Sequence, residues 1–335
     1  MSRLPEKDTT ESDNLIKTYL TCNSPTVDKL AEQYGYADRR NFTDAMRRRY
    51  GARRERNAGN ENEIDRPCPL TMGLQHKNQF IKQSNINPEL YLLNLQGTAL
   101  LFQDAHHPFA NKQCLNIIRR FAKELQPDVI IIPGDWWDIY QLSKFDKDPN
   151  RARDLQHDIN LGINTLYWIK QDCPNSKMIF LDGNHEDRIR KNMWAKTPET
   201  AVLDSSNPDE LLGLIKLEID RVPKTNRLLI NDKYQVLHGE VVRKHSGDTA
   251  RAHYEKFGGN GIIGHSHRGG LYNVKTNNIY GWTENYCTCV LNPMYVMNPN
   301  WLNGFTVVTF IKDLFFAEPV PMFNNRFIYG GKLYE

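Results

Sequence analysis

The chain has 335 residues, of which 39% are hydrophobic and 25% are charged, and its formal net charge is only +3. This composition is typical of a soluble globular protein with one large domain, or with a domain and an appendage. It excludes a polycation that coats nucleic acid along its whole length, and no apolar run approaches the ~18 residues of a membrane span.

The first predicted elements are a short tail and a group of helices. Residues 1–12 are polar, with no apolar segment of a signal peptide, so we expect a disordered tail on a cytoplasmic protein. Residues 13–56 have the pattern of three short helices, separated by Ser24-Pro25 and by Gly35, and are similar to a helix-turn-helix module. Residues 57–90 carry no hydrophobic periodicity and are interpreted as a linker.

Basic side chains are concentrated in the second half of this module. Between residues 39 and 56, eight arginines stand against two acidic residues, Asp44 and Glu55. This concentration is typical of a surface that binds the phosphate backbone of nucleic acid. An alternative is a helical bundle for self-association, on which the arginines are merely solvated. The candidate DNA-binding residues are Arg39, Arg40, Arg47, Arg48 and Arg49.

Residues 91–335 are predicted to form a second, larger domain. Strand-like runs end near residues 103, 133, 182, 238 and 264, and amphipathic helical patterns occupy 111–125 and 152–171. This alternation predicts βαβ units in an α/β sheet. Beyond residue 270 only short strand patterns remain, which predicts a second, mainly antiparallel sheet. There Cys287 and Cys289 would share one face of a strand, and packed free thiols are the simpler interpretation because the six cysteines form no CxxC pair.

Polar residues follow each predicted strand. The carboxyl ends of the strands in an open α/β sheet meet at one edge, so we expect these side chains to converge there. Asp104 and His106 are two residues apart, which would place them on one side of a strand. The clusters supply Asp104 and His106, then Asp135 and Asp138, then Asn184, His185 and Glu186, then His238, and finally His265 and His267.

Two aspartates, one asparagine and four histidines of this set are potential metal ligands. A mixture of oxygen and imidazole donors suits Mn²⁺, Fe, Zn²⁺ or Ni²⁺ better than Ca²⁺. Seven donors are too many for one four-ligand site, but they suffice for two metals that share a carboxylate. Two metals ~3.5–4 Å apart are an established device for displacement at phosphorus.

The ordered blocks Asp104-x-His106, Gly134-Asp135-x-x-Asp138, Gly183-Asn184-His185-Glu186, His238 and Gly264-His265-x-His267 resemble the signature of calcineurin-like metallophosphoesterases. The blocks span about half of the chain. The resemblance implies an α/β fold, a four-layer αββα sandwich, here preceded by the small all-α helix-turn-helix-like domain. It also implies two divalent metal ions, for which Mn²⁺ is favoured and Fe, Zn²⁺, Ni²⁺ or Mg²⁺ are alternatives. Asp104, His106 and His267 would hold one metal, Asn184, His238 and His265 the other, and Asp135 would bridge them.

The resemblance further implies hydrolysis by attack of a metal-bound hydroxide on phosphorus. His185 would protonate the leaving oxygen, and Asp138 and Glu186 are expected to accept hydrogen bonds that orient His185 or the ligand histidines. The remaining candidates for substrate binding are His107, Trp137 and Arg188; an indole at position 137 would be suited to stacking on an unpaired base.

Together these features predict a metal-dependent phosphodiesterase, and the favoured hypothesis is a DNA nuclease directed to its substrate by the N-terminal module. The pairing of the two modules resembles phosphoesterases of phage and prophage origin, which would act in a host cytoplasm. One alternative is a phosphatase or phosphodiesterase for small nucleotides or phosphoproteins, with the N-terminal module used for assembly into an oligomer. Another is a DNA-binding regulator whose phosphoesterase domain is an inactive scaffold.

Overall fold

A computed structural model describes residues 4–5, 9–21, 24–37, 39–50, 90–148, 154–274, 281–293 and 298–335. The chain divides into two compact units, Met1–Glu61 and Asn62–Glu335. The predicted linker, residues 57–90, lies outside the described residues except for Leu90. Among the residues that are described, no helix is both long enough and apolar enough to cross a membrane.

The described part of the first unit contains three helices, α1 (Thr10–Thr21), α2 (Ser24–Gln33) and α3 (Arg39–Tyr50). Its small core includes the fully buried side chains of Tyr19, Phe42 and Met46. Gly35, with φ +71°, lies in the turn after α2, where the sequence places a break. Helix α1 begins three residues earlier than predicted and Leu4 is buried, so part of the segment expected to be disordered belongs to the folded unit.

The second unit contains two six-stranded sheets among its described residues. Strands β2 to β5 of the first sheet are parallel, whereas β11 is antiparallel to both of its neighbours. All four residues of β3 are buried, as its uninterrupted apolar run predicts. This sheet, called the β3 sheet, has the order β12 (Leu314–Met322), β11 (Asn303–Ile311), β2 (Gly97–Leu101), β3 (Val129–Ile132), β4 (Lys177–Leu181) and β5 (Asp220–Val222).

The second sheet is called the β8 sheet and has mixed strand directions. The strands after residue 270 do not all pair with one another in one sheet: β10 joins the β8 sheet, and β11 and β12 extend the β3 sheet. Of the described strands, only β13 (Phe327–Tyr329) and β14 (Lys332–Tyr334) form a separate two-stranded antiparallel sheet. The predicted sheet of C-terminal strands is therefore wrong, because a strand pattern shows that a segment is extended but not which strand it pairs with. The order of the β8 sheet is β1 (Leu90–Leu93), β6 (Arg227–Ile230), β7 (Tyr234–Val236), β8 (Asn260–Ile263), β10 (Trp282–Tyr286) and β9 (Arg268–Tyr272).

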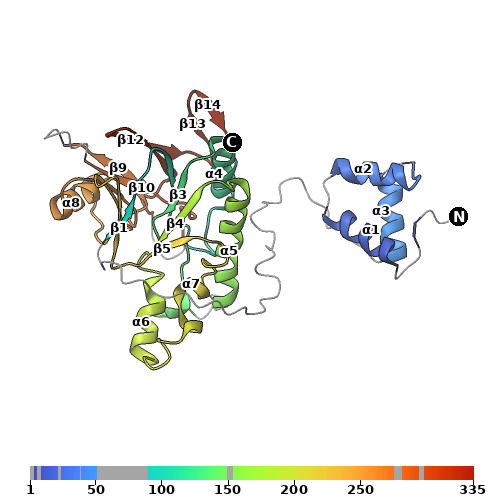
Figure 1. Cartoon of the computed structure of the whole chain (residues 1–335), viewed down its shortest axis with the longest axis horizontal. Helices are drawn as coiled ribbons and strands as arrows, with labels where there is room; N and C mark the ends of the chain where they lie inside the picture. Colours follow the sequence, from blue (N-terminus) through green and yellow to red (C-terminus); the bar gives the residue numbers. More distant parts are fainter. Residues whose placement is uncertain are drawn as a thin grey trace. The chain divides into compact units, whose positions relative to one another are not determined.

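Helices cover the outer faces of both sheets (Figure 1). Ile130 of β3 packs in one core with Phe121 of α4 (Lys112–Leu125) and with residues of α5 (Leu155–Asp172). Ile131, on the opposite face of β3, shares a second core with Val236 of the β8 sheet. On the far side, Ala250 of α8 (Asp248–Phe257) packs against Ile263. The second unit is therefore a four-layer αββα sandwich, as predicted.

The two long helices begin at capped positions close to the predicted ones. The Asn111 side chain accepts the N–H of Cys114 at 3.2 Å, and the Asp154 side chain accepts the N–H of His157 at 2.9 Å. Each cap satisfies an N–H that has no partner inside the helix. The remaining helical segments are α6 (Asp187–Lys196), α7 (Pro208–Leu211) and the short 3₁₀ helices at Tyr140–Leu142 and Asp204–Ser206.

Candidate metal centre

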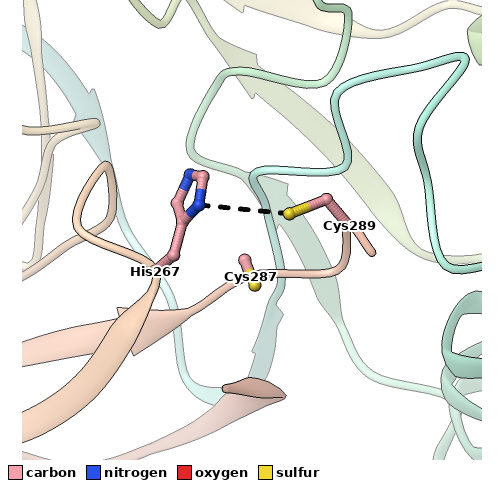
Figure 2. Close-up of side chains that lie close together, drawn as sticks. All are labelled: His267, Cys287 and Cys289. Carbon is pink, nitrogen blue, oxygen red and sulfur yellow. Dashed lines mark hydrogen bonds between the residues drawn. The ribbon is translucent and has the colours of Figure 1, made fainter. Parts of the chain in front are cut away.

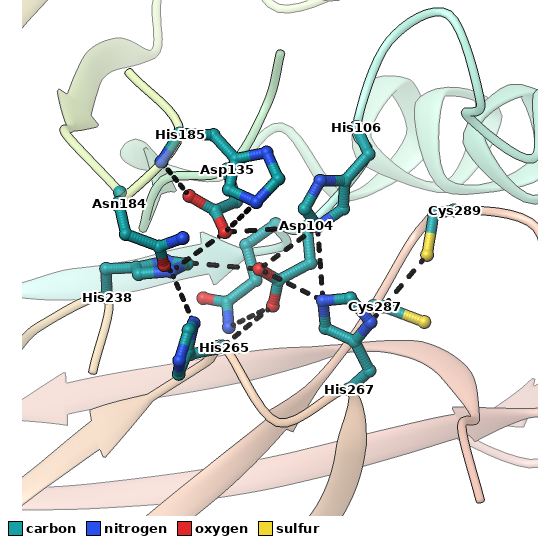
Figure 3. A network of polar contacts seen from close by, with 12 residues as sticks. Asp104, His106, Asp135, Asn184, His185, His238, His265, His267, Cys287 and Cys289 are labelled. Atoms are coloured by element: carbon teal, nitrogen blue, oxygen red, sulfur yellow. Dashed lines mark hydrogen bonds and ion pairs between the residues drawn. The ribbon is translucent and has the colours of Figure 1, made fainter. Parts of the chain in front are cut away.

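The polar clusters converge where the strands of the two sheets end (Figure 3). Three of the clusters follow β2, β3 and β4 of the β3 sheet, and two follow β7 and β8 of the β8 sheet. The site is therefore built between two sheets, and not along the edge of one sheet as predicted. The seven predicted ligands that come together are Asp104, His106, Asp135, Asn184, His238, His265 and His267.

Asp104, His106 and His267 form the first group of candidate ligands, and all three are buried. The Nε2 atoms of His106 and His267 are 3.2 Å apart, and Asp104 Oδ1 lies 3.6 Å from His267 Nε2. This carboxylate oxygen is buried and has no hydrogen-bond partner among the described residues. Such an oxygen is costly to bury alone, and a divalent cation shared with two imidazoles would satisfy it.

Asp135, Asn184, His238 and His265 form the second group. His238 Nε2 lies 3.0 Å from Asn184 Oδ1 and 3.3 Å from His265 Nδ1. His238 Nδ1 donates a hydrogen bond to the carbonyl oxygen of Pro133 at 2.8 Å. The proton of His238 is thereby placed on Nδ1, so Nε2 presents a lone pair to the site, as a metal ligand requires.

Asp135 lies between the two groups. Its Oδ2 atom is 3.2 Å from His238 Nε2 in the second group and 3.9 Å from His106 Nε2 in the first. Its other oxygen accepts the backbone N–H of His185 at 2.9 Å. Burial works to raise the pKa of Asp135, but His185, His238 and His106 hold it well below its usual range. A charged carboxylate between two sets of imidazoles has the placement expected of a bridging ligand.

Several of the predicted ligands have an unusual backbone conformation. Non-glycine residues rarely adopt positive φ, which costs ~1–2 kcal/mol per residue, and such strain is concentrated at functional sites. The sequence predicted that strand alternation places Asp104 and His106 on one side of a strand. That prediction is wrong, because both residues lie in a loop after β2, and the loop turns them toward the site. The five ligands with positive φ are Asp104 (52°), His106 (52°), Asp135 (50°), His265 (71°) and His267 (63°).

The loops that follow β3 and β4 are in direct backbone contact. A Cβ atom on Gly134 would lie 2.5 Å from the backbone nitrogen of Gly183, so a larger residue has no room there. The Glu186 carboxylate accepts backbone N–H bonds from Asp135 (2.9 Å), Trp137 (3.0 Å) and Gly183 (2.8 Å). Burial and the charge of Asp135 raise the pKa of Glu186 to about 7. Glu186 was expected to orient a histidine; it instead fixes the backbone that carries Asp135.

His185 lies beside Asp135 and is held by Asp138. Its Nδ1 atom is 2.8 Å from the carbonyl oxygen of Asp138 and 3.0 Å from the Asp138 carboxylate, which also lies 3.7 Å from His106 Nδ1. Arg188 Nη2 is 3.0 Å from His185 Nε2, and Arg188 Nη1 donates to the carbonyl oxygen of Asp138 at 2.7 Å. Burial works to lower the pKa of His185, but Asp135 and Asp138 raise it above its ordinary value.

Two of the predicted substrate-binding residues are buried. Trp137 is 0% exposed and donates from Nε1 to the carbonyl oxygen of Ile159 at 3.0 Å, and Trp136 donates to that of Gly162 at 3.2 Å. His107 is 4% exposed, its ring packs against Trp136, and burial lowers its pKa to about 3. The prediction that Trp137 and His107 contact substrate is wrong: these rings support the metal-site loop, and the indoles anchor it to α5.

We expect Trp137→Ala to act on stability and not on substrate recognition. Loss of a buried indole should lower the free energy of unfolding by about 3–5 kcal/mol, and KM should not rise selectively for single-stranded DNA over a small diester. Chemical denaturation and parallel kinetics measure both effects. Trp194→Ala is the matched control, because Trp194 is 62% exposed and its loss should change stability by at most ~0.5 kcal/mol. A selective rise in KM for DNA would contradict the packing role.

Cys287 and Cys289 lie beside the first ligand group (Figure 2). Both are buried free thiols, as expected. Cys289 Sγ is 4.0 Å from Nδ1 of His267, the ring nitrogen that does not face Asp104. Asn303 Nδ2 donates to the carbonyl oxygens of both cysteines, at 3.2 and 2.8 Å. The thiol of Cys289 thus borders the His267 ring, a contact that no spacing in the sequence indicates.

The predicted DNA-binding arginines belong to the first unit. Arg40 and Arg48 are exposed, whereas Arg39 forms an ion pair with Asp28 and Arg49 donates to the carbonyl oxygen of Pro5 at 2.8 Å. The side chain of Arg47 lies outside what the structure describes. The residues proposed for this role, Arg39, Arg40, Arg47, Arg48 and Arg49, all belong to α3.

Comparison with known proteins relates the chain to phage proteins. No protein-family profile matches it. It is 24% identical over 258 residues to the Gene 54 protein of Mycobacterium phage L5, and 23% identical over 274 residues to the Gene 54 protein of Mycobacterium phage D29. Each match covers 70% of this chain and 98% of the phage protein. The names of these relatives state no activity.

Similar solved structures include a single mutant of Vps29 from Entamoeba histolytica and a cold-active protein-tyrosine phosphatase from a psychrophilic Shewanella species. The first has a TM-score of 0.36 and 12% identity, over 70% of this chain and 95% of that one. The second has a TM-score of 0.33 and 11% identity, over 73% of this chain and 82% of that one.

Proposed function

We propose that the protein is a metal-dependent phosphodiesterase that hydrolyses nucleic acid, with DNA as the favoured substrate. The observation that carries the proposal is the pair of adjacent donor groups, one around Asp104 and one around His238, with the buried Asp135 between them. Two cations held by these adjacent groups would be suited to displacement at phosphorus. When bound, divalent cations supply Lewis acidity that lowers the pKa of water and neutralises the phosphoryl oxygens.

In this proposal His185 is the group that gives a proton to the leaving oxygen. The Asp138 carbonyl and carboxylate accept from Nδ1, so Nε2 is the ring nitrogen that can exchange a proton with substrate. Arg188 occupies that position now, and its guanidinium is suited to binding a non-bridging phosphate oxygen when substrate enters. The raised pKa of His185, which comes from Asp135 and Asp138 against the effect of burial, favours the protonated acid that this step needs.

A parallel substrate assay tests the proposed activity. The full-length protein with Mn²⁺ is incubated with linear DNA, circular single-stranded DNA, bis-p-nitrophenyl phosphate and p-nitrophenyl phosphate. We expect hydrolysis of the small diester and of DNA, and loss of both on addition of a chelator. Cleavage of the monoester but of neither the diester nor DNA would rule out the nuclease and favour a phosphatase. Binding of DNA without hydrolysis of any substrate would favour a regulator.

The helical unit is proposed to deliver the enzyme to DNA, since exposed arginines such as Arg40 and Arg48 lie on α3. We expect removal of residues 1–61 to weaken DNA cleavage and to make it less sensitive to salt, because fewer phosphate contacts release fewer counterions. Turnover of bis-p-nitrophenyl phosphate should stay unchanged. Cleavage rates measured across a range of salt concentrations decide the point, and unchanged DNA cleavage would assign the unit to assembly.

A further inference from the structure

A cavity of about 480 Å³ opens beside the second ligand group. His238 and Gly239, which follow β7, form part of its wall, and the loop between β5 and β6 forms another part through Lys224, Thr225 and Asn226. His238 belongs both to the cavity wall and to the second ligand group, and its Nε2 lies 3.2 Å from Asp135 Oδ2, so the cavity borders the candidate metal centre through this residue. A volume of this size is within the range of small-ligand sites.

Three cationic side chains line this cavity, and they differ in how they are paired. Lys256 Nζ forms an ion pair with Glu240 at 2.7 Å, and Arg227 donates to the Gln235 side chain at 2.9 Å. Lys224 Nζ donates to the carbonyl oxygen of Gly239 at 2.9 Å and forms no ion pair within the described part of the chain. Two of its three N–H groups therefore have no such partner, next to a cavity that adjoins the metal centre.

The environment of Lys224 favours an anion as the missing partner. Lys224 is half-buried, and burial lowers its pKa although Asp135, Glu240 and Asp187 act to raise it. An ammonium group taken partly out of water is stabilised by an anion that completes its hydrogen bonds. The four carboxylates that act on it belong to other contacts: Glu240 pairs with Lys256, and Asp187 pairs with Arg190. Asp135 lies between the ligand groups, and Glu186 accepts three backbone N–H bonds.

The rest of the lining fits a sugar-phosphate better than a base. The phenyl ring of Phe257 is already engaged by Arg227 at 5.5 Å, by Lys256 at 4.9 Å and by the indole of Trp282 at 6.1 Å. Thr225 and Asn226 are polar members of the lining, and the Thr225 hydroxyl donates to Asn226 Oδ1 at 3.0 Å. Among the described residues, Lys224 and Arg227 thus line the cavity without an ion pair, and only Arg227 is also stacked on an aromatic ring.

We propose that this cavity is a subsite for a second phosphate of the substrate, the one next to the scissile phosphate in a nucleic-acid strand, and that Lys224 binds it. The inference rests on the proposed function, because it assigns the scissile phosphate to the metal centre. Such a subsite would give the enzyme a preference for substrates that carry two neighbouring phosphates. A small diester such as bis-p-nitrophenyl phosphate has only one phosphate.

Binding of mononucleotides tests the subsite without requiring catalysis. Isothermal titration of the full-length protein with Mn²⁺ is carried out with thymidine 3′,5′-bisphosphate and with the 3′- and 5′-monophosphates. We expect the bisphosphate to bind roughly tenfold or more tightly than either monophosphate, the gain of one charge-assisted contact. In Lys224→Met the ratio of the bisphosphate affinity to the monophosphate affinity should fall to about threefold or less, whereas Lys224→Arg should keep most of this ratio.

Lys233→Met is the matched control, because Lys233 also donates to a backbone carbonyl, that of Asp313, but does not line the cavity. In Lys233→Met the ratio of bisphosphate to monophosphate affinity should equal that of the wild type. Equal affinities for mono- and bisphosphate in the wild type, or an undiminished ratio in a Lys224→Met variant whose thermal unfolding is unchanged, would overturn the subsite. Hydrolysis of bis-p-nitrophenyl phosphate by the wild type is measured in the same samples. If this diester is not hydrolysed but the affinity ratio is intact, the proposed phosphodiesterase activity is rejected and the phosphate subsite is not.

Discussion

Asp135→Asn should abolish metal-dependent hydrolysis of bis-p-nitrophenyl phosphate, with kcat/KM falling by roughly 10³-fold or more. The reason is the position of this carboxylate, 3.2 Å from His238 Nε2 and 3.9 Å from His106 Nε2. A neutral amide cannot supply the charge shared between two cations. Its oxygen can still accept the N–H of His185, so the loop should keep its conformation.

Metal content and folding have to be measured together with the rate for this variant. We expect reduced Mn²⁺ binding and an unfolding transition close to that of the wild type. Asp158→Asn is a suitable control, because Asp158 is also a buried carboxylate but lies on α5 and accepts from Gln141, outside the ligand groups. Asp158→Asn should retain activity. Near-normal turnover by folded Asp135→Asn would contradict a bridging role.

His185→Gln should slow hydrolysis in a way that depends on the leaving group. For a dinucleotide, whose leaving alkoxide needs a proton, we expect kcat to fall by about 10²-fold. For bis-p-nitrophenyl phosphate the loss should be much smaller, because nitrophenolate leaves without protonation. Mn²⁺ binding should stay unchanged, since His185 lies outside the two proposed ligand groups around Asp104 and His238.

Steady-state kinetics with the two substrates tests this role of His185. His157→Gln serves as the control, because His157 is exposed on α5 and no contact with the site involves it. Equal losses on both substrates would show that His185 acts through the geometry of the loop and not as a proton donor. In that case the alkaline limb of the pH–rate profile, where a proton donor is lost as the pH rises through its pKa, would also stay unchanged.

The layers of helices and sheets could be predicted from the sequence, but the pairing of strands within each sheet could not. The apolar run that forms β3 and the helical patterns of 111–125 and 152–171 depend on burial, which a sequence periodicity expresses directly. Strands β10 to β12 belong to two different sheets because of pairing between segments far apart in the sequence. The alternation of apolar and polar side chains in a strand does not identify its partner strand. The same limit explains why the residues after β4 and β8 were predicted to converge at the edge of one sheet, whereas they belong to different sheets.

The candidate ligands were predictable because their residue types are unusual at strand ends, whereas their supporting residues were not. Nothing in the sequence separates Trp137, which is buried against α5, from an indole that stacks on a base. Glu186 was identified, but its role as an acceptor for three backbone amides follows from the contact of two loops. Gln103, which donates to Asp104 Oδ2 at 3.1 Å, and Lys224 stand in no motif and could be found only from their contacts.

The most direct test of the proposed dinuclear centre is the number of Mn²⁺ ions bound per chain. Protein treated with a chelator is titrated with Mn²⁺, and bound metal is measured together with hydrolysis of bis-p-nitrophenyl phosphate. We predict two ions per chain in the wild type, with hydrolysis reaching its maximum only when both are bound. Full activity with one ion or with none would contradict a dinuclear centre.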